Sequence, residues 1–228
     1  VLQICAIFIA ATRGTLLALV LAGIVALLYA AVSSHGRTRT YARTAIAGVI
    51  IVATLFVVFR SDIAKIPIEF LHRVATISVS DTTVSSRLFV WKNMLPQAMS
   101  HPILGTGAET IETIFNRVYD PGKILEQWFD RTHNSFLDYF VQYGILGLLL
   151  YCALIFGILY NGIRRYRDDG EKDGLLFALL AFVYAVSDFF VFDTAVAFSL
   201  LLAIAALVPY GINRKNDKLR TLPFRSPK

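Results

Sequence analysis

His133 begins the sequence pattern that most clearly suggests a catalytic role. It is followed by Asn134, nine further residues and Gly144-Ile145-Leu146-Gly147, where a charged segment gives way to an apolar one. An imidazole exchanges a proton near neutral pH and can act as a general base. Gly144 and Gly147 would let another helix or a lipid tail approach the backbone closely. Such residues are also common structural features of membrane helices, so this pattern alone leaves both interpretations open.

Two arginines could bind an anionic group. Arg13 interrupts an otherwise uncharged stretch of 32 residues. A charge at the centre of a bilayer costs roughly 2.5–3.5 kcal/mol on insertion scales, so it needs a partner or a function. Arg87 precedes Trp91 by four positions, and its planar fork of N–H donors suits phosphate oxygens. The plain alternatives are that Arg13 marks a helix end and that Arg87 is an ordinary surface charge.

Carboxyl groups near these residues are weaker candidates. Glu109 and Glu112 would share one face of a helix, which could support acid–base or metal chemistry, although a solvated face is the simpler interpretation. Asp130 or Asp138 could orient the histidine, and the sequence does not choose between them. The turn-rich segment 102–107 lacks the glycine and lysine spacing of a phosphate-binding loop.

The elements that must position these residues are predicted to be membrane helices. The 228-residue chain is 56% hydrophobic and has a mean hydropathy of +0.61, which is more apolar than an ordinary soluble domain. Its apolar residues form blocks between charged stretches, as in a membrane protein. Val1 lies inside an apolar run without the features of a signal peptide, so we expect a larger parent protein.

Six apolar segments predict an all-α fold, namely a polytopic bundle of transmembrane helices. The segments are the end of one helix at 1–12 and further helices at 15–32, 45–59, 135–160, 174–192 and 195–210. The segment 15–32 matches a hydrocarbon core of ~30 Å at about 1.5 Å rise per residue. The segment 45–59 is short, and Arg43 and Arg60 could complete it by reaching the two interfaces.

A segment of different composition, residues 60–133, separates the third predicted span from the fourth. It holds eight Lys/Arg and eight Asp/Glu, which is typical of a water-exposed region. Within it, residues 86–94 predict an amphipathic helix with Leu88, Trp91 and Leu95 on one face. We therefore expect a large, partly helical loop domain between membrane helices.

The distribution of basic residues predicts the orientation. The predicted loops 33–44 and 161–173 and the tail 213–228 share one side and hold three, four and six Lys/Arg. Such loops face the cytoplasm, which also explains the net charge of +6 without nucleic-acid binding. The predicted units are transmembrane helices at 1–59, a periplasmic loop domain at 60–133, transmembrane helices at 134–212 and a cytoplasmic tail at 213–228.

Together these features resemble the C-terminal portion of the O-antigen ligase-like membrane protein family. The family includes O-antigen ligases, O-antigen polymerases and bacterial protein O-oligosaccharyltransferases. The pattern from His133 to Gly147 resembles the family's most specific motif, and Thr12-Arg13-Gly14 resembles its Ser/Thr-Arg-Gly element. Arg87 with Trp91 and the following Pro102–Gly107 resembles the start of its large periplasmic loop. The resemblance covers nearly the whole chain.

The resemblance implies metal-independent glycan transfer, without a cofactor, at the periplasmic face of the bacterial inner membrane. The donor would be a glycan on undecaprenyl diphosphate. The acceptor would be lipid A–core in an O-antigen ligase of lipopolysaccharide biosynthesis, another lipid-linked glycan in a polymerase, or a Ser/Thr of a protein. Arg13 and Arg87 would bind and stabilise the diphosphate, and His133 would take the proton of the acceptor hydroxyl. Further substrate-binding residues would be Asn134, Gly144 and Gly147.

A membrane transporter is the main alternative from another functional class, since it too has intramembrane charges and helix-breaking glycines. It should carry ionisable residues near the bilayer midplane, whereas the predicted spans 15–32 and 45–59 carry none. A structural assembly subunit gives no reason for the histidine and glycine pattern. The enzyme hypothesis requires Arg13, Arg87 and His133 to meet near one cavity at the outer interface.

Overall fold

The computed structural model describes residues 13–67, 75, 82–123 and 129–220. These residues form helices and turns without a strand, so the predicted all-α fold class is confirmed for this part of the chain. The elements in chain order are α2 (Arg13–Ser33), α3 (Gly36–Val58), α4 (Arg60–Ile63), α6 (Thr82–Ser100), α7 (Ile111–Val118), the 3-10 helix η1 (Pro121–Lys123), α8 (Ser135–Asp169), α9 (Lys172–Asp188) and α10 (Ala195–Arg220).

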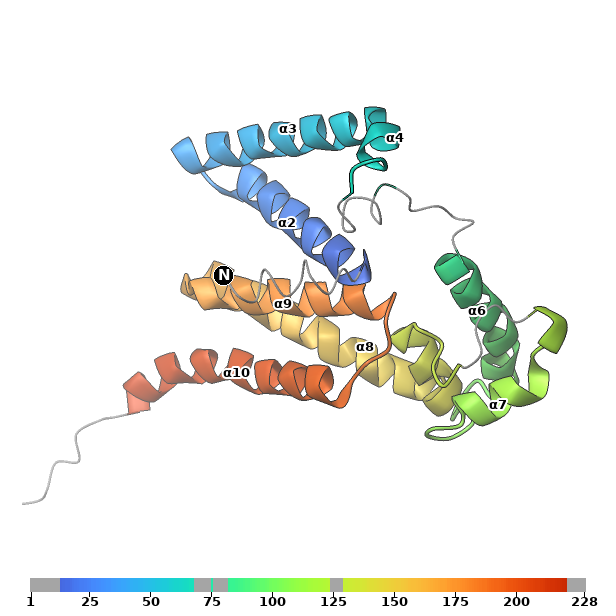
Figure 1. Cartoon of the computed structure of the whole chain (residues 1–228). Helices are drawn as coiled ribbons and strands as arrows, with labels where there is room; N and C mark the ends of the chain where they lie inside the picture. Colours follow the sequence, from blue (N-terminus) through green and yellow to red (C-terminus); the bar gives the residue numbers. More distant parts are fainter. Residues whose placement is uncertain (1–12, 68–74, 76–81, 124–128, 221–228) are drawn as a thin grey trace, which may run out of the picture.

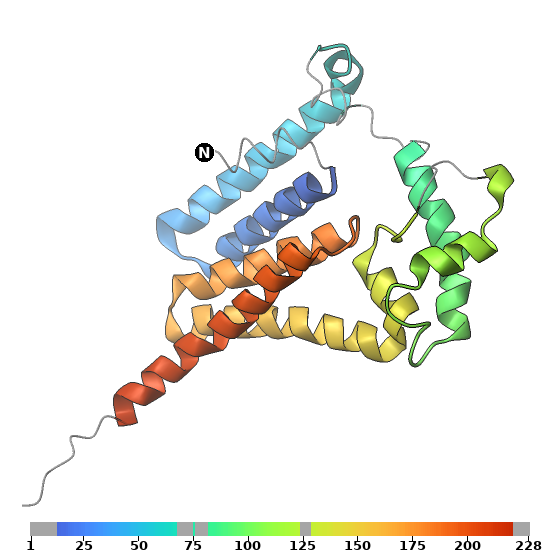
Figure 2. The same cartoon turned by 60° about the horizontal axis from the view of Figure 1, so that its bottom comes forward.

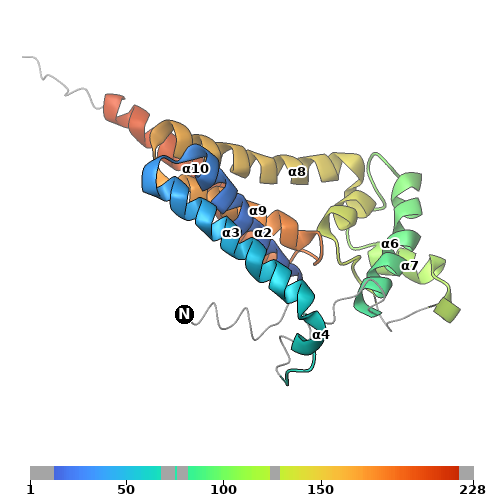
Figure 3. The same cartoon turned by 90° about the horizontal axis from the view of Figure 1, so that it is seen from above.

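The long helices lie side by side, and α6 and α7 lie at one end of them (Figures 1 and 2). Helix α8 packs against α9 and α10, and α2 packs against α9 and α3. Helix α6 contacts the beginning of α8, close to the turn that joins α9 to α10 (Figure 3). The candidate residues from distant parts of the sequence therefore have one end of the bundle at which to meet.

Within the described residues, α3 and α8 are long and apolar enough to cross a membrane. Leu17–Ser33 and Ala195–Val208 are shorter apolar helices. Only 6% of the apolar window of α3 is buried inside the protein, and Val52 and Val57 are 66% and 71% exposed. An apolar surface of this extent marks a contact with lipid or with another protein.

Three segments predicted as loops or tail are helical. Helix α3 begins at Gly36, so the predicted loop 33–44 shrinks to Ser34 and His35. Helix α8 continues through the predicted loop to Asp169, and α10 continues to Arg220. Arginine and alanine favour helix, and arginine can extend its charge beyond the hydrocarbon core. The end of an apolar run is therefore not the end of its helix.

Arg165 joins the end of α8 to the start of α9 and to the middle of α10, far from α6 and α7. Its guanidinium donates to Glu171 at 2.7 and 2.9 Å, to Asp173 at 2.6 Å and to the carbonyl oxygen of Leu207 at 3.2 Å. The side chain is only 9% exposed. A residue that the sequence assigns to a basic loop is thus a buried link between α8, α9 and α10.

We expect Arg165→Ala to lower the free energy of unfolding by about 2 kcal/mol, because hydrogen bonds to charged groups contribute about 1.5–3 kcal/mol each. The loss stays limited because Glu171 and Asp173 are 46% and 45% exposed and water can solvate them. Thermal unfolding in detergent measures the change. Arg164→Ala is the control, since its surface pair with Asp168 spans 3.5 Å and contributes at most about 1 kcal/mol. Equal losses in the two variants would contradict a linking role.

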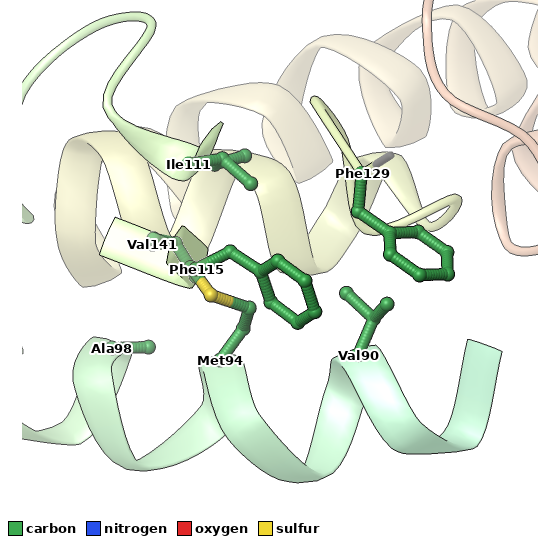
Figure 4. Packing of buried hydrophobic residues seen from close by; sticks show 7 residues of the cluster. All are labelled: Val90, Met94, Ala98, Ile111, Phe115, Phe129 and Val141. Atoms are coloured by element: carbon green, nitrogen blue, oxygen red, sulfur yellow. The ribbon is translucent and has the colours of Figure 1, made fainter. Parts of the chain in front are cut away.

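Two clusters of buried apolar side chains hold these elements together. The first joins α6 and α7 to the start of α8 and consists of Val90, Met94, Ala98, Ile111, Phe115, Phe129 and Val141 (Figure 4). The second lies between α8, α9 and α10 and consists of Tyr151, Ile155, Ile158, Ala181, Leu201 and Val208. The first cluster fixes the α6–α7 unit (residues 82–123 and 129–134) against α8.

The helix predicted at 86–94 is confirmed within α6, but the apolar face that the sequence indicated is not the most buried one. Val90, Met94 and Ala98 are fully buried at a spacing of four residues, whereas Leu88 and Leu95 are 48% and 51% exposed. Both sets of residues repeat with helical spacing, so periodicity alone does not distinguish them. The contact with α7 and α8 decides which face is buried.

Candidate active site

His133 lies immediately before α8 and has a left-handed backbone conformation with φ +56°. Such a conformation is uncommon outside glycine and persists where the surroundings fix it, often at functional sites. Thr132 is fully buried; its N–H donates to Asp138 Oδ1 at 2.9 Å and its hydroxyl to the carbonyl oxygen of Asn134 at 3.0 Å. The Asn134 side chain caps α8 by accepting the N–H of Leu137 at 3.1 Å. Both neighbours of the histidine are thus held in place.

Helix α6 holds the same loop from its other side. The Trp91 Nε1–H donates to the carbonyl oxygen of Thr132 at 2.8 Å. The indole also packs edge-to-face against Phe189, with ring centroids 6.3 Å apart. Arg87 lies four residues before Trp91 and therefore on the same face of α6. The loop that carries His133 is held against the part of α6 that also carries Arg87.

The His133 ring packs against two aromatic side chains. Its centroid lies 5.5 Å from that of Phe192 and 6.3 Å from that of Phe129. Phe192 belongs to the turn that joins α9 to α10 (residues 189–194). This apolar surrounding restricts the positions open to the imidazole, as a group that exchanges a proton with a substrate requires.

The α9–α10 turn also brings the beginning of α2 to the same place. A Cβ atom added to Gly14 would lie 3.0 Å from the Cβ atom of Phe190, so the first turn of α2 packs directly on it. Arg13 is the first residue of α2, and the position of its side chain lies outside what the structure describes. The three segments predicted to carry the site therefore converge on the turn 189–194, which the sequence prediction treated only as a connection.

Gly144 interrupts α8 and creates a docking place for the loop at 101–107. Its φ of +65° and ψ of −165° are not helical. The carbonyl oxygens of Val141 and Gln142 each accept an N–H from this loop at 2.9 Å, and the Ile145 N–H donates to one of its carbonyl oxygens at 2.7 Å. The break in α8 thus frees backbone groups that the loop then pairs.

Close contact between the two backbones explains the glycines on both sides. A Cβ atom on Gly144 would lie 2.3 Å from the carbonyl oxygen of Ile103, and one on Gly105 would lie 2.4 Å from the backbone of α8. Gly147 has a different reason, since a Cβ atom there would lie 2.2 Å from the Cβ atom of Tyr143. The close approach expected at Gly144 occurs, but its partner is a loop rather than another helix.

A polar pocket of about 200 Å³ lies beside the His133 loop. Its polar lining consists of Glu109, Arg131, Ser135, Asp138, Gln142, Asp193 and Thr194, and its aromatic lining of Tyr139, Tyr143 and Phe198. Burial raises the pKa of the Asp193 carboxyl above its ordinary value. His133 and Arg87 do not line this pocket. No group of three His, Cys, Asp or Glu side chains is placed to hold a metal ion in the described part of the chain.

The pocket residues could not be selected from the sequence as a set. Arg131 donates to both carboxylate oxygens of Glu109, at 2.7 and 2.8 Å, across 22 positions of sequence. Asp193 and Thr194 join them from the turn that precedes α10. For Asp193 and Thr194, the only signal in the sequence is a carboxylate and a hydroxyl in a short turn between two apolar helices.

Trp91→Phe tests whether α6 positions the histidine. The variant keeps an aromatic ring against Phe189 but removes the hydrogen bond to Thr132, which contributes about 0.5–1.5 kcal/mol. We expect the glycan transfer that the resemblance implies to fall about ten-fold in the full-length protein, since a small misplacement of a reacting group is costly, with thermal stability little changed. Trp91→Phe with unchanged transfer would show that this bond does not position His133.

A family model described as O-antigen ligase matches residues 1–152, which include each site residue predicted from the sequence. The chain belongs to this family. Its members are membrane-embedded bacterial enzymes that transfer glycans, in reactions of the O-antigen ligase or polymerase type. No curated protein matches the chain.

The O-antigen ligase match ends within α8, so the turn 189–194 lies beyond the matched residues. The structure nevertheless places Phe192 against His133 and Phe189 against Trp91. The family match therefore identifies the segments with candidate chemistry, and the structure adds the turn on which they meet.

Proposed function

We propose that this protein transfers a glycan from undecaprenyl diphosphate to an acceptor hydroxyl at the periplasmic face of the inner membrane, as an O-antigen ligase that acts on lipid A–core. The proposal is carried by one observation: the segments of Arg13, Arg87 and His133 converge on the α9–α10 turn, although they lie far apart in sequence. Family membership supports glycan transfer in general.

The proposed chemistry needs a base and fixed positive charge. The acceptor oxygen attacks the anomeric carbon of the donor sugar as the bond from that carbon to the diphosphate oxygen breaks. His133 takes the proton of the attacking hydroxyl. Arg13 and Arg87 stabilise the negative charge that develops on the departing diphosphate, which is effective where water is excluded. The capping side chain of Asn134 and the glycines of α8 contribute by shaping the substrate site.

The proposed orientation follows from where the basic residues lie. The arginines at the start of α3 and at the end of α8 belong to the end of the bundle opposite the α6–α7 unit (Figure 1). Positive charge near helix ends favours the cytoplasmic side. The segment 60–133 then faces the periplasm, α3 and α8 cross the membrane, and the remaining apolar helices complete a polytopic bundle.

Glycan transfer by the full-length protein in liposomes tests the proposal. An undecaprenyl-diphosphate glycan is supplied with and without lipid A–core. Transfer that requires lipid A–core supports a ligase, whereas chain growth without it would identify a polymerase. Transfer only to protein Ser/Thr would identify a protein O-oligosaccharyltransferase. A well-folded protein that transfers to none of these acceptors would contradict the enzyme proposal and favour a transporter.

The same assay tests the planar fork of Arg87. Arg87→Lys keeps the positive charge but loses the bidentate geometry that suits phosphate oxygens. Transfer should fall at least about ten-fold, because hydrogen bonds to charged groups contribute about 1.5–3 kcal/mol. Arg117→Lys on the exposed face of α7 is the matched control. Full transfer by Arg87→Lys would show that the planar bidentate geometry of Arg87 is not required.

A further inference from the structure

We infer that the polar pocket between the α6–α7 unit and the start of α10 binds a neutral, hydroxyl-rich sugar unit of the acceptor. The pocket is bounded by Glu109, Arg131, Tyr143, Asp193 and Phe198. Naming this sugar as the acceptor rests on the proposed function. Binding of a neutral sugar is the part that follows from the lining itself, and it can be measured separately.

The lining has both polar and aromatic groups, and these complement the two kinds of surface that a sugar presents. A sugar ring carries hydroxyl groups around its rim, and these can bond to carboxylates, amides and other hydroxyls such as those of Asp138, Gln142 and Thr194. Its C–H faces can pack on aromatic rings such as those of Tyr143 and Phe198. The volume of about 200 Å³ is below the roughly 300–1,000 Å³ of sites for drug-sized ligands. The pocket therefore suits a single sugar unit.

The charges of the pocket argue against the diphosphate of the donor. Three carboxyl groups, those of Glu109, Asp138 and Asp193, share the lining with one guanidinium, that of Arg131. Arg131 is paired with Glu109, so their charges cancel. The remaining two carboxyl groups make the pocket neutral when protonated and negative when ionised. While Arg131 and Glu109 stay ionised and paired, the pocket has no net positive charge, and a diphosphate would find no attraction there.

The side of the pocket formed by Glu109 is held rigidly. Glu109 has a left-handed backbone with φ +56°, and its N–H donates to Gln142 Oε1 at 2.6 Å. Its carboxylate accepts two hydrogen bonds from Arg131. A strained residue held from both sides indicates a preformed site, which lowers the entropic cost of binding a ligand.

The pocket and the candidate base share structural supports. Asp138 lines the pocket and also accepts the N–H of Thr132, the residue before His133. Ser135 lines it too and donates to the carbonyl oxygen of Val191, in the turn that contacts the histidine ring. A sugar held in the pocket lies next to the His133 loop without occupying it. We therefore assign the pocket to positioning the acceptor and not to the chemical step.

Kinetics of the full-length protein separate this role from catalysis. Tyr143→Leu removes an aromatic face from a side chain that is 41% exposed. Glu109→Gln removes the negative charge while keeping the shape of the side chain. We expect either change to raise the KM for acceptor about ten-fold, with kcat and the KM for donor unchanged within about two-fold. Glu112→Gln, outside the pocket, is the matched control. A fall in kcat or a rise in the donor KM with an unchanged acceptor KM would overturn the inference.

Direct measurement of sugar binding tests this inference separately from the proposed function, because binding does not require glycan transfer. The probes are the oligosaccharides released from lipid A–core and from the donor lipid, titrated by calorimetry into the protein in nanodiscs. Binding that weakens about ten-fold in Tyr143→Leu and Phe198→Leu supports the pocket, even if the wild type transfers no glycan and the proposed function fails. Binding of neither probe, or equal binding in all folded variants, would overturn the pocket even in an active enzyme.

Discussion

Replacing His133 by alanine is expected to lower glycan transfer by about 10²–10⁴-fold, the contribution typical of a positioned general base. The fold should survive, because hydrogen bonds of Thr132, Asn134 and Trp91 hold this loop and do not require the imidazole. The variant loses the packing of the imidazole against the rings of Phe192 and Phe129. Activity and stability should therefore separate in this variant.

His133→Asn makes the test sharper. Asparagine tolerates the left-handed backbone conformation, so it preserves the geometry of the loop while removing the ability to take up a proton. Transfer in liposomes should be as low as in His133→Ala, whereas thermal unfolding should match the wild type more closely. His101→Asn, at an exposed histidine, is the control for the chemical change. If His133→Asn retained transfer within a few-fold of wild type, the histidine would not be the base.

Local sequence patterns predicted the helices and the segments of the site, because both depend on neighbours along the chain. Long apolar runs without breakers predict helix, and the structure has α2, α3, α8, α9 and α10 at these runs. The pattern from His133 to Gly147 marks a loop entering a helix, and the structure places the cap of α8 at Asn134. The family that these patterns indicated is confirmed.

Contacts between distant segments were not predictable in the same way. Trp91 meets Thr132 across 41 positions and Ser135 meets Val191 across 56, and no local pattern relates such residues. The buried face of α6 could not be identified for the same reason, since Leu88 and Val90 are both apolar and only packing distinguishes them. The sequence predicted the α9–α10 turn as a connection but not its role at the site, because that role consists entirely of such contacts.

Gly144→Ala is expected to lower the free energy of unfolding by about 3 kcal/mol and to abolish most transfer. The backbone conformation of Gly144 is nearly exclusive to glycine and costs about 1–3 kcal/mol for another residue. The new Cβ atom would lie 2.3 Å from the carbonyl oxygen of Ile103, so the loop at 101–107 must move and lose hydrogen bonds worth about 1 kcal/mol each. Thermal unfolding measures the loss, and hydrogen exchange at Thr106 and Gly107 reports the displaced loop.

Gly157→Ala is the control within the same helix. Nothing lies within 4 Å of a Cβ atom added to Gly157, so stability should be unchanged or rise by up to about 1 kcal/mol from helix propensity. Similar losses at Gly144 and Gly157 would show that α8 simply tolerates no change.

A double-mutant cycle would show that Gly144 and Gly105 serve one interface. Gly105→Ala should reproduce the loss seen in Gly144→Ala, because its Cβ atom would lie 2.4 Å from the backbone of α8. Once either variant has displaced the loop, the second Cβ atom meets little further resistance. The double variant should therefore lose less than the sum of the two single losses, by about 0.5–3 kcal/mol as for residues in contact. Additive losses would mean that each glycine is required for its own backbone conformation and that the docked loop is not a shared unit.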